Sequence, residues 1–229
     1  MFVVVFEVHP ALGKKDEYLG LAKHLKPILE TIDGFIDNER FESQRHKGWV
    51  LSLSTWRDEK AVVRWRSQGE HHRIQEMGRS GIFSDYHLRV CEVTGDSHPP
   101  EGMQVIEQRL DTSVVGKAKS LAITEISPAE NTTFPADADW IQKHLAFDEH
   151  ADGLVEYDLF ESIYNPGKML LLTSWKTPEQ SARWTPMPLA EARELRHRRA
   201  RNVRDYGMFE RGEATQYFPD AKCPVEAKA

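Results

Sequence analysis

Apolar and polar residues alternate along several short segments of this chain, and the longest such stretch occurs twice. Residues 33–65 and 152–184 align without a gap at an offset of 119, and 11 of the 33 positions are identical. Upstream, residues 6–11 correspond to residues 124–129 at an offset of 118. A repeat of about 120 residues has the size of a small domain, so the pattern predicts two homologous domains in tandem.

The hydrophobic pattern of the first copy predicts a β-α-β-β-α-β order, which is the ferredoxin-like arrangement. Alternation in the first strand puts Val3, Val5 and Glu7 on one face. The first helix has an amphipathic pattern, and we expect Pro27 to kink or split it. The predicted elements are a strand at 2–8, a helix at 14–32, strands at 35–43 and 48–55, a helix after Asp58 and another through Arg79, and a strand at 86–93.

The second copy repeats this order. Thr177, followed by Pro178, marks the start of its second helix. The arginine-rich segment 193–204 is interpreted as a solvated helix face. The predicted elements are a strand at 121–126, a helix at 137–150, strands at 155–162 and 169–175, and a last strand at 200–209. The predicted domains are residues 1–94 and 119–212, with a linker at 95–118 and a tail at 213–229.

A four-stranded antiparallel sheet that carries both helices on one face leaves its other face bare. In both hairpins the alternate positions are apolar or aromatic, as in a sheet that is buried on both sides. We therefore predict an α+β fold in which the two ferredoxin-like domains pack sheet to sheet as an intramolecular α+β barrel. Such a pseudo-dimer is a monomer in one chain, or it assembles further into a homodimer.

Composition narrows the functional classes. Hydrophobic residues make up 40% and charged residues 29% of the chain, as in ordinary globular proteins. The net charge of -6 and the pI of about 5.9 argue against nucleic-acid binding. No apolar run has the length of a membrane span and no secretory signal is recognised, so we expect a cytoplasmic protein without membrane contact. Two cysteines are too few for a metal quartet, and no metal site is predicted.

Several segments resemble the antibiotic biosynthesis monooxygenase (ABM) family. In the first copy these are residues 64–93 (RWRSQGEHHRIQEMGRSGIFSDYHLRVCEV) and the hairpin with DGFI, FES and LSLSTW. In the second copy they are DGLVEYDLFES, LLLTSW and RDYGMFERGEA. The resemblance implies a dimeric α+β barrel with a ligand cleft between sheet and helices in each half. Members of the family include cofactor-free oxygenases of phenolic polyketides, haem-degrading enzymes and proteins of quorum-signal metabolism.

From this resemblance we expect a monooxygenase that acts on a small, electron-rich organic substrate, phenolic or polyketide-like, with a general base in an apolar cleft and no cofactor. One alternative is a haem-binding oxidoreductase of the same fold. Another is a non-catalytic protein that binds a small molecule.

Three residues are candidates for the base. Glu7 is a carboxylate on an otherwise apolar strand, and it either acts in catalysis or pairs with a nearby arginine. His71 and His72 are neighbours on a helix and point about 100° apart, so at most one of them faces a cavity. Each of the two is otherwise an exposed helical histidine.

The candidate substrate-binding residues are Trp65, Arg79 and Tyr86 in the first copy, with Glu125 and Trp184 as the counterparts of Glu7 and Trp65 in the second. Trp65 is either a core residue or a wall of the pocket, and it can be both. His197 would be the ligand in the haem alternative. His71 and His72 have no clear counterparts after Trp184, so we expect one working cleft in the first half, or two clefts with different ligands.

Overall fold

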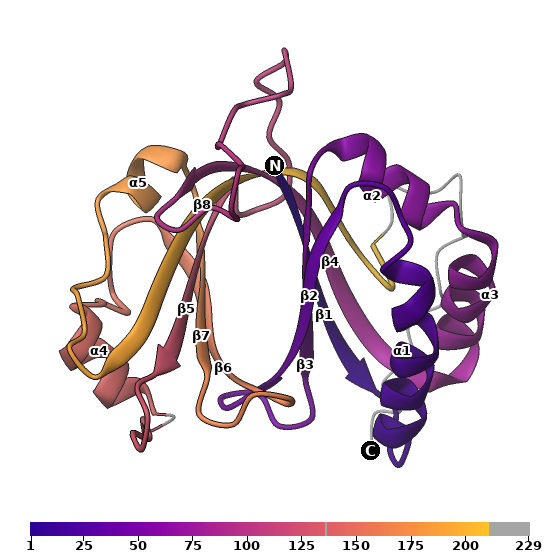
Figure 1. Ribbon diagram of the computed structural model, residues 1–229, viewed down its shortest axis with the longest axis horizontal. Coiled ribbons are helices and arrows are strands. Elements are labelled where there is room, and N and C mark those ends of the chain that lie inside the picture. The colour runs from indigo at the N-terminus through magenta and orange to yellow at the C-terminus, as the bar shows by residue number, and fades with distance from the viewer. Residues whose placement is uncertain (136, 211–229) are drawn as a thin grey trace, which may run out of the picture.

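The computed structural model describes residues 1–135 and 137–210. The predicted tail at 213–229 therefore lies outside the described residues. Within these residues, eight strands form one closed barrel in the order β1-β3-β2-β6-β7-β5-β8-β4, and the prediction of an intramolecular α+β barrel is confirmed. The helices cover the outer surface of the barrel, on its two opposite sides (Figure 1).

The first half holds four strands and three helices, with a π-helical turn before the last strand. Its elements are β1 (Phe2–Pro10), α1 (Lys15–Leu29), β2 (Phe35–Ser43), β3 (Val50–Trp56), α2 (Glu59–Arg66), α3 (Gly69–Met77), η1 (Gly78–Ile82) and β4 (Phe83–Asp96). Pro27 lies inside α1 and does not split it. The helix continues for two residues beyond Pro27 and ends at Leu29.

The second half repeats the order with much shorter helices. Its elements are β5 (Ser120–Pro128), α4 (Ala138–Leu145), β6 (Leu154–Ser162), β7 (Met169–Trp175), α5 (Pro178–Ala182) and β8 (Ala192–Gly207). The interpretation of residues 193–204 as a solvated helix face is wrong, because this segment lies within β8. Carboxylates bind four of its arginines: Arg196 pairs with Asp96, Arg198 with Glu125, Arg201 with Glu92, and Arg204 with Glu59.

Local sequence signals set the turns and the helix starts. Gly34 and Gly153 occupy equivalent turns with φ of 91° and 85°, a region that glycine enters without strain. A Cβ on Gly34 would also approach the Ala61 Cβ to 2.7 Å, and one on Gly153 would overlap Gln180. Asp58 and Thr177 cap α2 and α5 by accepting hydrogen bonds from backbone amides. The Asp-Gly turn occurs in both copies because in each copy the glycine lies too close to the following helix for a side chain to fit.

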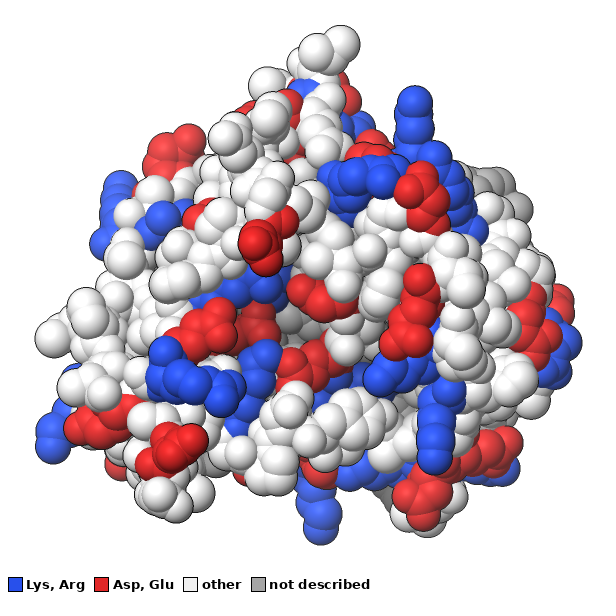
Figure 2. Space-filling view, in the orientation of Figure 1, with Lys and Arg blue, Asp and Glu red and all other residues white. Residues whose placement is uncertain are grey.

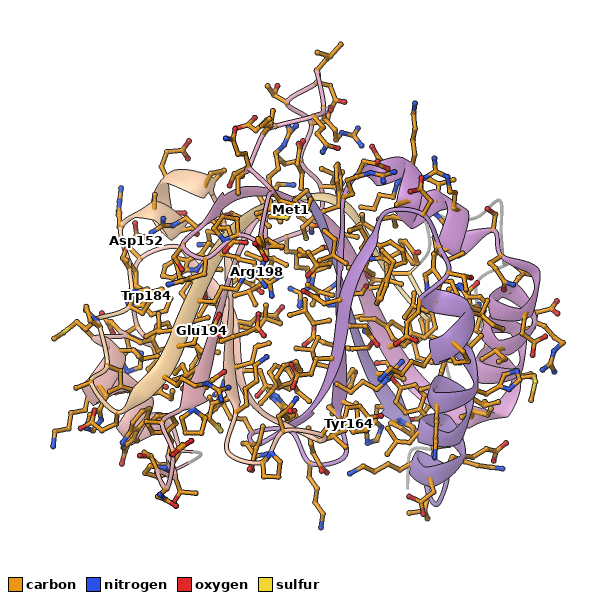
Figure 3. The ribbon with its side chains drawn as sticks, in the orientation of Figure 1. Met1, Asp152, Tyr164, Trp184, Glu194 and Arg198 are labelled. Atoms are coloured by element: carbon orange, nitrogen blue, oxygen red, sulfur yellow. The ribbon has the colours of Figure 1, made fainter. Side chains whose placement is uncertain are left out.

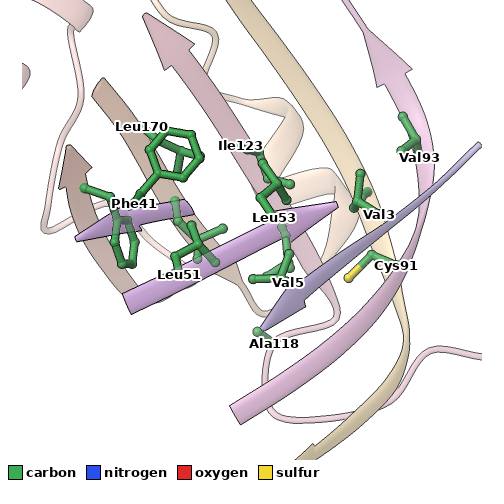
Figure 4. Close-up of a cluster of buried hydrophobic side chains, with 14 of the residues drawn as sticks. Val3, Val5, Phe41, Leu51, Leu53, Cys91, Val93, Ala118, Ile123 and Leu170 are labelled. Carbon is green, nitrogen blue, oxygen red and sulfur yellow. The ribbon is translucent and has the colours of Figure 1, made fainter. Parts of the chain in front are cut away.

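Pairing of β2 with β6 and of β4 with β8 joins the two halves into one sheet. Side-chain contacts across this junction follow the repeat. The Ser43 hydroxyl donates to Asp158 at 2.7 Å, and the equivalent Ser162 hydroxyl donates to Glu39 at 2.5 Å. The barrel interior is an apolar cluster drawn from both halves, including Val3, Val5, Phe41, Leu51, Leu53, Leu121, Ile123, Phe160, Leu170 and Leu172 (Figure 4).

Charged side chains flank this apolar interior. Acidic and basic residues are mixed on the face shown in Figure 2, and both signs gather around a hollow at its centre. One polar cavity of the interior, about 260 Å³ in volume, is lined by Glu125, Lys168, Glu194, Arg196 and Arg198 among others. The strands of each half thus bury both of their faces. The inner surface faces the other half, and the outer surface lies beneath the helices of the same half.

Candidate functional site

A cavity of about 190 Å³ lies in the first half between the outer face of its sheet and its helices. Residues from α1, α2, α3 and all four strands of that half line it, and Arg204 and Tyr206 of β8 complete one side. Its walls are mostly apolar. They include Val4, Phe6, Leu21, Leu25, Leu29, Val62, Ile74, Phe83 and Leu88. The expectation of a cleft between sheet and helices is met in this half.

Trp65 and His71 form one wall of the cavity. Their rings stack with centroids 4.0 Å apart and an interplanar angle of 13°. Gln68 caps α3 by accepting a hydrogen bond from the His71 amide at 2.7 Å, so the helix start fixes the histidine's position. The Nδ1 atom of His71 lies 2.9 Å from the carbonyl oxygen of Trp65. Trp65 is thus both a packing residue and a pocket wall.

The contact with the Trp65 carbonyl fixes the tautomer of His71. A carbonyl oxygen only accepts hydrogen bonds, so Nδ1 carries the proton and donates it. Burial lowers the pKa of His71 to about 4, and the imidazole is therefore neutral near pH 7. In this tautomer Nε2 holds a lone pair. His71 can accept a proton or a hydrogen bond from a molecule in the cavity.

Arg79 and Tyr86 lie together on another wall. The Arg79 guanidinium donates a hydrogen bond to the Tyr86 hydroxyl, and both side chains line the cavity. The η1 turn brings Arg79 to this place. It begins at Gly78, where an added Cβ would lie 2.3 Å from the Phe83 ring. The structure therefore brings four of the predicted residues together in one cavity: Trp65, His71, Arg79 and Tyr86.

Glu7 and His72 do not line this cavity. Glu7 lies on the opposite face of β1, where alternation also places Val3 and Val5, and it forms an ion pair with the buried Arg89. The expectation that Glu7 shares the cleft with Trp65 is corrected, and its alternative as a paired carboxylate is what the structure shows. His72 follows His71 on α3 and is not among the residues that line the cavity.

The same inward pair recurs in the second half. Glu125 forms ion pairs with Arg198 and, at 2.8 Å, with Lys168. Burial acts to raise the pKa of its carboxyl, and the two positive charges act to lower it. Its carboxyl pKa is lowered, although burial alone would raise it. Figure 3 shows Arg198 between the two sheets, away from the helices. Glu125, like Glu7, therefore lies on the inner surface of the barrel and not in a cleft between sheet and helices.

The outer face of the second half is closed. Trp184 is 9% exposed and packs with Ile141, Leu145, Phe147 and Trp175 where the first half has its cavity. Its Nε1 donates to the Leu145 carbonyl at 3.2 Å. Trp184 is a core residue here, whereas the equivalent Trp65 lines an open cavity.

His197 lies on β8 rather than on a helix. Its Nδ1 is 2.9 Å from the Thr124 hydroxyl, and its ring meets the edge of Trp184 at 5.4 Å and 86°. Burial lowers its pKa to about 4, and its Nε2 is buried without a hydrogen-bond partner among the described residues. An axial haem ligand needs an accessible ring nitrogen, so His197 as placed does not fit a haem.

A polar group inside the cavity was missed by the sequence analysis. Tyr18 on α1, Asn38 and Arg40 on β2, and Ser52 and Ser54 on β3 all line it. The repeat contained a signal for them. An offset of 119 aligns Arg40 with Leu159 and Ser52 with Leu171, which are core residues of the second half.

Metal ligands and membrane spans are the two remaining features to consider in the described part of the chain. No group of three or more His, Cys, Asp or Glu side chains is placed to hold a metal ion in residues 1–135 and 137–210. Within the same residues, no helix has the length and apolarity that crossing a membrane requires.

Comparison with known proteins adds the following. Residues 1–77 match the family model described as antibiotic biosynthesis monooxygenase. The chain is 39% identical over 225 residues to a protein of Pyricularia oryzae named jasmonate monooxygenase ABM, covering 96% of this chain and all of that protein.

Two solved structures show weaker similarity. A putative monooxygenase of Fusobacterium nucleatum is 10% identical with a TM-score of 0.40, over 89% of this chain and 93% of that one. An anthrone oxidase-like protein is 12% identical with a TM-score of 0.36, over 96% of both chains. Similarity at this level does not bear on function.

Proposed function

The chain belongs to the antibiotic biosynthesis monooxygenase family, and from that premise we propose that the cavity of the first half is the active site of a monooxygenase for a small, mainly apolar organic molecule. His71 acts as the proton acceptor and Trp65 forms the wall that holds it. The observation that carries this proposal is the fixed tautomer of His71, whose Nε2 lone pair belongs to a residue of the cavity lining.

In the proposed reaction, His71 Nε2 takes a proton from an acidic carbon or hydroxyl of the substrate. The resulting carbanion or phenolate is electron-rich enough to reduce dioxygen directly. Conversion of an activated methylene to a carbonyl releases four electrons, so one oxygen atom enters the product and the other leaves as water. This version of the reaction needs no resident cofactor. Hydroxylation of an unactivated carbon releases only two electrons and would need an external two-electron donor.

The other residues of the cavity support proton transfer. The apolar walls exclude water, which favours the neutral form of His71 and strengthens hydrogen bonds inside the cavity. Formation of a substrate anion beside the ring raises the proton affinity of the imidazole, since opposite charges attract in a low-dielectric site. In this proposal Arg79 and the Tyr86 hydroxyl donate hydrogen bonds to developing negative charge, and their contact on one wall of the cavity supports that role.

Because the relative from Pyricularia oryzae is named jasmonate monooxygenase ABM, jasmonate is the first substrate to test. Phenolic or polyketide-like molecules remain the second class, because they carry the acidic positions that cofactor-free oxygenation uses. Assays with and without an added reductant distinguish oxidation of a methylene to a carbonyl, which needs no reductant, from hydroxylation, which needs one.

The test compares His71→Asn with its neighbour His72→Asn. Oxygen consumption and product mass are measured with jasmonic acid and with anthrone. General-base catalysis contributes about 10²- to 10⁴-fold, so His71→Asn should lose at least about 100-fold in kcat. His72→Asn should stay within about twofold, because it removes a similar side chain outside the cavity. Equal losses in both variants, or full activity of His71→Asn, would contradict the proposal.

A further inference from the structure

One end of the cavity is polar, and two of its side chains have hydrogen-bonding capacity that is not used. We call Tyr18, Asn38 and Arg40 the Arg40 corner. Tyr18 is 6% exposed, and its hydroxyl lies near Arg40 without a well-formed hydrogen bond among the described residues. The Nε atom of Arg40 is also buried and without a partner there. Buried donors in proteins are nearly always satisfied, so two in one corner indicate a missing partner.

The positive charge of Arg40 is not neutralised within the described residues, where no carboxylate lies within ion-pair distance of it. Its NH1 group donates to the Asn38 side-chain oxygen at 3.0 Å. The Asn38 amide nitrogen donates to the Ser52 hydroxyl at 3.1 Å and to the Leu53 carbonyl at 2.9 Å, which turns the oxygen toward Arg40. Asn38 therefore positions the guanidinium without cancelling its charge. By contrast, Arg204 on the cavity wall pairs with Glu59 at 3.3 Å.

Tyr18 contributes a neutral donor. Burial raises the pKa of its hydroxyl, and the charge of Arg40 opposes that shift without reversing it. The phenol therefore keeps its proton near neutral pH and can donate it to an acceptor. A group that accepts from both residues and carries negative charge would complete the corner.

The fold itself does not require an arginine at this position. The Ile163 amide donates to the Arg40 carbonyl at 2.9 Å, and the Gln44 amide donates to the Leu159 carbonyl at 2.8 Å in the equivalent place. The strand junction is thus the same in both halves, while the side chain is a buried leucine in one and an arginine in the other. The hairpin that brings Ile163 also carries Tyr164, which lies at the base of the first half in Figure 3.

We propose that the Arg40 corner binds the carboxylate of an elongated, mainly apolar organic acid. Arg40 donates to the carboxylate oxygens and Tyr18 donates a further hydrogen bond. The apolar body lies along α1, because Tyr18 is in the first turn of that helix and Leu29 in its last. Eleven residues of helix span about 16 Å. This inference deepens the proposed function, since it assigns a substrate class to the same cavity.

The experiment measures equilibrium binding by calorimetry with acids and their methyl esters, which differ in charge but hardly in shape. The probe pairs are jasmonic acid with methyl jasmonate, and 3-phenylpropanoic acid with its methyl ester. The unmodified protein should bind each acid at least about tenfold more tightly than its ester, because a charge-assisted hydrogen bond is lost in the ester.

Three variants sharpen the result. Arg40→Gln should weaken binding of the acids at least about tenfold and leave the esters within about twofold. Tyr18→Phe should weaken acid binding by a smaller factor of about three to ten, as for a neutral donor. Arg45→Gln is the matched control for net charge, because Arg45 stacks on Tyr157 outside the cavity and should leave both affinities unchanged.

Equal affinity for acid and ester in the unmodified protein would overturn the inference, and that comparison does not depend on any variant folding. An unchanged preference in Arg40→Gln would overturn it as well, and so would the absence of binding by both acids. Tight acid binding that depends on Arg40 but leads to no oxygenation would support the Arg40 corner and contradict the monooxygenase proposal alone.

Discussion

The two halves share one backbone plan and differ in what lies beneath their helices. In the first half, Asn38, Arg40, Ser52 and Ser54 face a cavity under long helices. In the second half, Leu159 and Leu171 occupy two of the equivalent positions and pack against Trp184 under short helices. The inner surfaces, in contrast, have stayed alike. This difference indicates that contacts of the inner surface hold the barrel together. The outer surface of one half is therefore free to bind a ligand.

The largest expected effect is on stability. It tests whether the space beneath the helices is filled in the second half and open in the first. Trp184→Ala should lower the free energy of unfolding by about 4 kcal/mol, since it leaves a cavity in a filled core. Trp65→Ala, at the equivalent position on an open cavity, should lower it by only about 1 kcal/mol. Urea denaturation measures both. Equal losses would mean that the first half is as tightly filled as the second.

The next test concerns the inner surface, where the halves are expected to agree. Arg89 and Arg198 are each 1% exposed, and each binds a carboxylate and a hydroxyl. Arg89→Met and Arg198→Met should each lower the free energy of unfolding by about 3 kcal/mol, because each removes the buried guanidinium that pairs with a carboxylate of the barrel interior. Thermal denaturation should give similar losses for both. A large loss in one variant alone would show that the inner surface is not symmetric.

Each half also holds one histidine with a lowered pKa, which gives a test by pH. His71 and His197 have folded-state pKa values of about 4, below their ordinary value of 6.5. Below pH 6.5 the unfolded chain binds protons that the folded chain does not, so stability should fall between pH 6.5 and 4. Each histidine contributes about 1.4 kcal/mol per pH unit and at most about 3 kcal/mol in total.

Denaturation at pH 7, 6, 5 and 4 measures this slope. The variants His71→Phe and His197→Phe should each flatten it, while His150→Asn, at an exposed position, should leave it unchanged. Retention of the full slope in both variants would show that neither histidine is kept neutral by the fold.

The smallest effect compares two tyrosine hydroxyls. Tyr18 in the first half has no hydrogen-bond partner among the described residues, whereas Tyr157 in the second donates to Glu149. Tyr18→Phe should therefore raise the free energy of unfolding by about 1 kcal/mol, and Tyr157→Phe should lower it by about 1 kcal/mol. For a chain of this size such changes move the melting temperature by about 2 to 4 °C in opposite directions. A loss of stability in Tyr18→Phe would indicate that its hydroxyl has a structural partner.

The fold followed closely from the sequence, because its signals are local or repeated. The alternation in 2–8 puts Val3 and Val5 on one face and Val4 and Phe6 on the other, and the structure places the first pair inside the barrel and the second outside. The Asp-Gly turns and the helix caps at Asp58 and Thr177 act within a few residues of themselves. The sequence also contained the difference between Arg40 and Leu159, although only the structure showed that it mattered.

The sequence by itself determined the duplication, the order of the elements along each copy and the two faces of the first strand, since these depend on short-range spacing and on identity between the copies. Only the tertiary structure decided which charged residues are paired. In the sequence, segment 193–204 has the pattern of a charged helix. In the structure it is a strand, and Asp96, Glu125 and Glu92 from other strands pair with its arginines. The same holds for Glu7, whose face was predicted but whose partner, Arg89, lies 82 residues away. A buried charge is stabilised by partners that no local pattern reveals, so the tertiary structure alone could show that Glu7 is paired inside the barrel and Arg40 remains available in the cavity.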